Sequence, residues 1–124
     1  MGRSTEPSTE VFNEILALNS VGGDREFLTE IIGLIQAAWP TLLAEIRGGM
    51  AMGDIAAVQR SARLAKAAAR NVSASRAYEC ALQLEMMTNM GDLSAAQRAI
   101  ASLEQEVERF QSVLPAFLTA EYSQ

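Results

Sequence analysis

Basic side chains recur along residues 59–70 with a spacing that places them on one side of a helix. At 100° per residue they fall within about a third of the helix circumference, and we call this side the basic face. Its residues are Gln59, Arg60, Arg63, Lys66, Ala67 and Arg70. Guanidinium and ammonium groups are positively charged hydrogen-bond donors at neutral pH, so the chemistry they offer is the binding of an anion.

The basic face stands out because the chain as a whole is acidic. Between Ile55 and Tyr78 there are five basic residues and no acidic one, whereas the formal net charge of all 124 residues is −5. Like charges three or four residues apart repel by about 0.2–0.5 kcal/mol per pair, so helix stability does not explain the pattern. An anionic surface ligand would explain it. Arginine is also common on exposed helix faces, so a face without any function remains an alternative.

Several other chemistries are excluded by composition. The chain has no histidine, and Cys80 is its single cysteine, so an internal disulfide or an ordinary zinc, copper or haem site cannot form. Cys80 lies among apolar helix positions and is expected to be a buried, inert thiol. Glycine-rich phosphate loops and nucleophile elbows are absent. We therefore expect no enzymatic activity, no metal and no cofactor.

Length and composition indicate a single folded domain. The chain is 49% hydrophobic and 20% charged, and we expect a disordered tail at 1–8 and one domain at 9–124. The longest apolar stretch is interrupted by Gln36 and Pro40, so no membrane span is expected. No signal-peptide core is present near the start. Because a single cysteine cannot form an internal disulfide, the expected compartment is the cytoplasm. A net acidic domain without accompanying basic loops is also a poor binder of nucleic acid.

Apolar periodicity predicts helices throughout, and strand patterns are absent. Three Gly-Asp pairs, which end at Asp24, Asp54 and Asp92, each supply a left-handed helix end followed by an N-cap. Pro40 is expected to kink or briefly break its helix, and Pro115 to kink the last turns of another. The predicted helices cover about 9–19, 24–50, 54–71, 74–89 and 92–120. Because the connections are short, we expect an all-α fold, an up-down-up-down antiparallel four-helix bundle with a short additional N-terminal helix.

Two long apolar stripes define the expected core, and Trp39 is expected to pack within the bundle. The stripe of the last helix is Leu93, Ala96, Ile100, Leu103, Val107, Phe110, Leu114 and Phe117. The stripe of the second is Leu28, Ile31, Ile35, Ala38, Leu42 and Ile46. On the helix that carries the basic face, the opposite side has only small residues, Val58, Ala65, Ala68, Ala69 and Val72, which would allow neighbouring helices to approach closely.

The order and spacing of these segments resemble the histidine-containing phosphotransfer (HPt) domain family over about residues 24–120. The family is a four-helix bundle with a short extra helix, and its second long helix carries the pattern H-x-L-K-G followed by N-[apolar]-G-A. The corresponding segments here are 63–67 (RLAKA) and 71–74 (NVSA). The turn at 52–54 (MGD) and the segment 81–85 (ALQLE) also match elements of the family.

The chain departs from this family at the residue that carries the phosphoryl group. Arg63 occupies the histidine position, and a guanidinium stays protonated and offers donors only, so Arg63 cannot be the phosphoacceptor. Ala65 and Ala67 replace the family's leucine and glycine, while Lys66 is retained. The resemblance therefore implies a phosphorelay-type domain that cannot itself carry phosphate.

The resemblance also implies the partners, a response-regulator receiver domain, a histidine kinase, or both. Receiver domains present a cluster of acidic side chains, to which Arg63 could bind as a competitor without phosphotransfer. The protein itself is expected to be a monomer or a weak homodimer. The alternative is a structural or dimerising bundle with no phosphorelay role, which associates through the 93–117 stripe.

Overall fold

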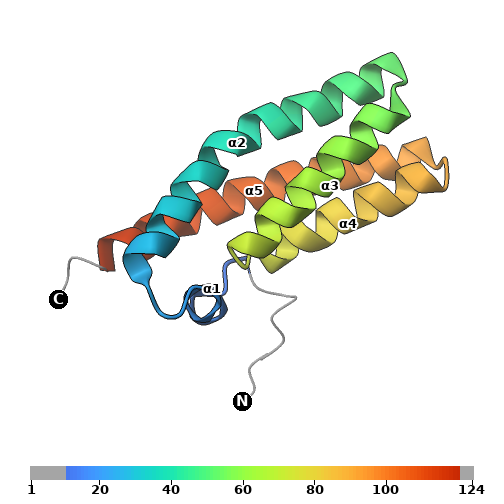
Figure 1. Ribbon diagram of the computed structural model, residues 1–124. Helices are drawn as coiled ribbons and strands as arrows, with labels where there is room; N and C mark the ends of the chain where they lie inside the picture. Colours follow the sequence, from blue (N-terminus) through green and yellow to red (C-terminus); the bar gives the residue numbers. More distant parts are fainter. Residues whose placement is uncertain (1–10, 121–124) are drawn as a thin grey trace.

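All regular elements within residues 11–120, which the computed structural model describes, are helices (Figure 1). They are α1 (Glu14–Ser20), α2 (Arg25–Met52), α3 (Ile55–Asn71), α4 (Ser75–Asn89) and α5 (Leu93–Ala120). The prediction of an all-α fold is confirmed for this range, and α2 to α5 lie within two residues of their predicted bounds. The predicted tail at 1–8 lies outside the described residues.

At each predicted Gly-Asp pair, the glycine allows the chain to turn and the aspartate caps the N-terminus of the helix that follows. The glycine before each aspartate has a positive φ, between 71° and 81°, in the left-handed region that a residue without Cβ adopts at little cost. The carboxylates of Asp24, Asp54 and Asp92 each accept a hydrogen bond from the backbone N–H three residues further on, at 3.0, 3.1 and 3.0 Å. These caps satisfy amides of the first turns of α2, α3 and α5.

The four long helices form a helical bundle in which sequential neighbours pack together. Helix α3 packs against α2 on one side and α4 on the other, α4 packs against α5, and α5 also contacts α2 (Figure 1). The predicted stripe of α5 is buried from Ala96 to Phe117, and only its first residue, Leu93, is largely exposed. A single core cluster receives side chains from all five helices.

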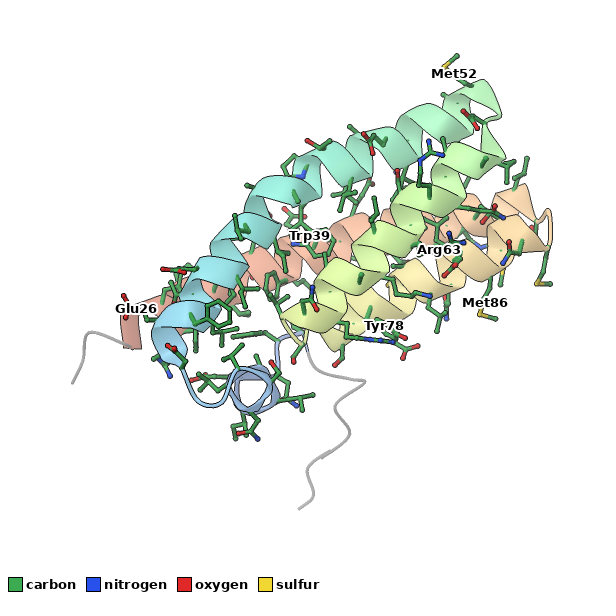
Figure 2. All side chains as sticks on the ribbon, in the orientation of Figure 1. Glu26, Trp39, Met52, Arg63, Tyr78 and Met86 are labelled. Carbon is green, nitrogen blue, oxygen red and sulfur yellow. The ribbon has the colours of Figure 1, made fainter. Side chains whose placement is uncertain are left out.

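The predicted stripe of α2 is correct at four of six positions and wrong at two. Ile32 and Trp39 are fully buried, whereas Ile31 is half-buried and Ala38 is exposed. The larger side chains set the helix rotation, because burying Trp39 removes far more apolar surface from water than burying Ala38. Figure 2 shows Trp39 pointing from α2 into the interior of the bundle.

The prolines do not interrupt their helices. α2 continues through Pro40 and α5 through Pro115, so the short break expected at Pro40 is wrong. Pro40 is exposed, while Trp39 and Leu42 on either side of it are buried. Packing on both sides of the proline therefore holds the helix together despite the lost backbone hydrogen bond.

Helix α1 begins at Glu14, later than expected, because Asn13 is its N-cap and accepts a hydrogen bond from the backbone N–H of Leu16 at 3.0 Å. The N–H of Asn13 in turn donates to the carbonyl of Ser73, in the α3–α4 turn, at 3.0 Å. The ring of Phe12 packs edge-to-face against Phe110, with 5.5 Å between centroids. The segment before α1 therefore closes the end of the core.

Helix α2 is, among the described helices, the one long and apolar enough by length and composition to cross a membrane. The same composition occurs in core helices, and the buried side of α2 packs within the bundle.

Candidate functional site on helix α3

Helix α3 has one buried side of small residues and one exposed side of basic residues. Its buried residues are Val58, Ser61, Ala62, Ala65 and Ala69, while Ala68 is half-buried. With so little side-chain volume on this side, the backbone of α3 can approach its neighbours closely. The opposite side of α3 is largely exposed to solvent, with some contacts from α4.

The structure brings all six residues of the basic face to this side of α3. Gln59 and Lys66 are half-buried, and the other four are exposed. Arg63 lies in the middle of the helix with 66% of its side chain exposed, so its guanidinium is not in the hydrophobic interior (Figure 2). Arg60 has no ion-pair partner among the described residues.

Glu85 of α4 lies against the centre of the basic face and was missed by the sequence analysis as a site residue. Its carboxylate accepts a hydrogen bond from Lys66 Nζ at 2.7 Å and one from Arg63 Nε at 3.3 Å, and its side chain is 14% exposed. The hydrogen bond from Lys66, and secondarily that from Arg63, holds the pKa of Glu85 below its usual value. Glu85 is therefore a charged counter-ion for two of the cations.

At the C-terminal end of the basic face, Arg70 is held by the aromatic residue Tyr78. Nη2 of Arg70 donates a hydrogen bond to the hydroxyl of Tyr78 at 3.0 Å, and its guanidinium lies 5.3 Å from the centroid of the same ring. At the opposite end, the amide of Gln59 donates to the side chain of Asn89. Contacts to α4 therefore orient several side chains of the face, which lowers the entropy lost on binding.

An apolar groove of about 680 Å³ lies beside the Arg70 end of the face. Figure 1 shows α2 and α3 diverging away from their joint, and the groove opens in this region. Phe27 and Leu34 contribute exposed apolar surface, 50% and 73% of each residue being accessible. The lining residues are Ser20, Val21, Phe27, Ile31, Leu34, Ile35, Arg70 and Asn71. The apolar surface of the groove therefore lies next to an exposed cation, Arg70.

The structure also bears on metal binding and on the reactivity of Cys80. No group of three or more His, Cys, Asp or Glu side chains suited to a metal occurs within 11–120. Cys80 is half-buried rather than fully buried, and burial, followed by the charge of Glu106, raises the pKa of its thiol. A raised thiol pKa disfavours the nucleophilic thiolate.

At the centre of the basic face, Glu85 orients the Arg63 side chain and leaves part of its guanidinium exposed to solvent. Nε of Arg63 is directed to Glu85, so its two terminal nitrogens form the edge available to a ligand.

Comparisons of the chain with known protein families, curated protein sequences and solved structures found no match.

Proposed function

We propose that this protein is a cytoplasmic, non-enzymatic HPt-like domain that binds a receiver domain or a histidine kinase of a two-component system without carrying phosphate. The observation that carries the proposal is the position of Arg63. It is an exposed cation at the histidine position of the HPt pattern, halfway along a helix whose exposed side is basic.

The arrangement of the helices supports the proposal. The finer topology we propose is an up-down-up-down antiparallel four-helix bundle with α1 as the additional helix. In Figure 1 the α2–α3 and α4–α5 joints lie at one end of the molecule and the α3–α4 turn lies at the other. Each joint is only a few residues long, which suits sequential helices that run in opposite directions.

The surface around Arg63 suits an acidic protein pocket with apolar surroundings. The terminal guanidinium nitrogens can donate two parallel hydrogen bonds to one carboxylate of the partner. The adjoining groove, with Phe27 and Leu34, offers apolar surface that a protein partner can cover. Because desolvation offsets part of the ion-pair energy, we expect Arg63 to contribute about 1–3 kcal/mol to binding.

Calorimetry with purified receiver domains of the same organism tests the proposal. We expect Arg63→Ala to weaken binding about fivefold or more, and binding of the wild type to weaken as salt is raised. Arg98→Ala is the matched control, because Arg98 is an exposed arginine on α5. Equal affinity of the wild type and Arg63→Ala for every receiver that binds would overturn the role of Arg63.

Restoring the family's residues gives a second test. The Arg63→His variant, with and without Ala67→Gly, is mixed with phosphorylated receiver and examined for acid-labile phosphate on the protein. Phosphate on either variant supports a docking surface of the relay type, since the imidazole then meets the phosphoryl group. Failure of both variants to bind a receiver or accept phosphate favours the structural alternative.

That structural or dimerising alternative has one observation in its favour, the apolar surface exposed by α1 and α2. Ile15 and Leu34 are each 73% exposed. The 93–117 stripe is not available for association, because from Ala96 to Phe117 it lies inside the chain's own core. Sedimentation of the wild type and Leu34→Glu over a range of concentrations tests this alternative, and a dimer abolished by Leu34→Glu together with absent receiver binding would favour it.

A further inference from the structure

Glu85 and its two cations form a site whose charge differs from that expected from the basic face alone. Arg63 and Lys66 carry two positive charges, and the Glu85 carboxylate, at 3.3 and 2.7 Å from their nitrogens, removes one. The centre of the basic face therefore has a net charge of about +1 rather than +2. Lys66, with 23% of its side chain exposed, is directed to Glu85 rather than outward.

The geometry leaves one set of donors for a ligand. Since Nε of Arg63 is bound to Glu85, an incoming anion meets the edge formed by the two terminal nitrogens. This edge can pair with two oxygens of a carboxylate or of a phosphoryl group, so discrimination between them must come from the surrounding charge. A phosphoryl group carries close to two negative charges and has three acceptor oxygens that are best satisfied by several cations. Here it would meet the Arg63 edge beside the Glu85 carboxylate, which lowers the positive charge around it, while Arg60 lies one turn away on α3.

We propose that Glu85 is a specificity-determining residue, which makes the Arg63 site select carboxylates and exclude phosphoryl groups. This inference rests on the proposed function and deepens it, because the chain would then bind the acidic pocket of a receiver before its phosphorylation and release it afterwards. Glu85 acts both as a repulsive charge toward a dianion and as a positioning residue that holds Arg63 and Lys66.

The first test uses small anions and does not depend on any protein partner. The side-chain Nε–H resonance of Arg63 is followed by NMR while acetate or inorganic phosphate is added at constant ionic strength. In Glu85→Gln we expect phosphate to bind at least about threefold more tightly relative to acetate than in the wild type, since a like charge has been removed. Glu79→Gln, on the same helix, is the charge-matched control, and its ratio should equal that of the wild type.

The second test uses the receiver domain itself. The wild type should bind the unphosphorylated receiver more tightly than the same receiver activated with beryllofluoride, and Glu85→Gln should reduce this difference about threefold or more. Urea unfolding followed by Trp39 fluorescence ensures that both variants are folded.

The outcomes separate the two proposals. If neither form of the receiver binds the wild type, the proposed function fails, and the small-anion titration alone decides the role of Glu85. If the receiver binds but its preference between the two forms is the same in the wild type and Glu85→Gln, the proposed function stands and the role of Glu85 is wrong. An unchanged ratio of phosphate to acetate affinity in Glu85→Gln likewise overturns the inference.

Discussion

Gly49 of α2 lies directly against Val58 of α3, with no room between them for a further methyl group. A methyl group on Gly49 would lie 2.8 Å from Cγ2 of Val58 and 3.2 Å from the carbonyl oxygen of Asp54. Both Gly49 and Val58 are buried. The close approach lies beside the α2–α3 joint, and away from it the helices diverge, which leaves the apolar groove open at the other end (Figure 1).

Gly49→Ala is predicted to destabilise the protein, because the new methyl group overlaps Val58 and neighbouring backbone. We expect the free energy of unfolding to fall by about 1–3 kcal/mol, as for other overpacked cores. Urea unfolding followed by Trp39 fluorescence measures the change, since Trp39 is the single tryptophan. Gly48→Ala is the matched control, because it also replaces a helical glycine by alanine but adds a methyl group that meets nothing within 4 Å.

A double-mutant cycle identifies the atoms responsible. If the clash with Val58 dominates, Gly49→Ala combined with Val58→Ala should cost less than the sum of the two single changes. Additive costs would show that the contact with the Asp54 carbonyl, or a shift of α2, accounts for the loss instead.

Ser73→Gly is predicted to stabilise the protein. Ser73 has φ of +55° and is buried, so its Cβ is held in a conformation that L-residues other than glycine adopt at a cost of about 1–2 kcal/mol. Glycine relieves this cost and keeps the carbonyl that accepts from Asn13, although its greater freedom in the unfolded chain offsets part of the gain. We expect a rise of about 0.5–1 kcal/mol in the free energy of unfolding, measured in urea. Ser73→Val should lower it, and a stabilising Ser73→Val would contradict this explanation.

The helices were predictable from the sequence because their ends are encoded locally. The aspartates at 24, 54 and 92 form caps with amides three residues away, and each follows a glycine with positive φ. The rotation of α2 was less predictable, because Ile31 and Ile32 are equally apolar and only tertiary packing selects between them. The continuity of α2 through Pro40 also depends on packing, which a rule about local backbone preference omits.

The candidate site was predictable only where a single helix forms it. The spacing of Arg60, Arg63 and Arg70 placed them on one side of α3, and the structure has them there. Glu85 could not be assigned in this way, because it is 19 residues from Lys66 and meets it only when α4 packs on α3. The absence of acidic residues near the basic face in sequence therefore did not mean an absence in space. The groove was missed because it arises from the divergence of two helices.

The ion pairs of Glu85 predict how its contribution to stability depends on pH. Its pKa in the folded protein is lowered, first by the hydrogen bond from Lys66 and then by that from Arg63. Glu85 therefore binds a proton more readily in the unfolded chain than in the folded protein. Its contribution to folding stability is fully present above the ordinary pKa of about 4.5, and it is lost as pH falls through the lower pKa of the folded protein. The difference in stability between the wild type and Glu85→Gln should shrink between pH 7 and pH 3.

An NMR titration of the Glu85 carboxyl carbon separates the two partners. Lys66→Ala should raise the pKa of Glu85 more than Arg63→Ala does, because the shorter hydrogen bond, 2.7 Å, comes from Lys66. The opposite ranking would show that Arg63 is the main partner in solution, and that Lys66 is more available to a ligand than its burial indicates.

Trp39→Phe is predicted to be mild for a substitution at a fully buried tryptophan. The Trp39 side chain is completely buried, and its indole N–H has no hydrogen-bond partner among the described residues. Phenylalanine loses packing volume but also removes this unpaired donor, whose burial costs about 1–3 kcal/mol. We therefore expect Trp39→Phe to lower the free energy of unfolding by less than about 2 kcal/mol, and Trp39→Ala to lower it by about 3–5 kcal/mol. Urea unfolding followed by circular dichroism measures both costs. Equal costs for the two variants would mean that the indole N–H has a hydrogen-bond partner in solution. That partner, rather than ring volume alone, would then anchor α2 in the bundle.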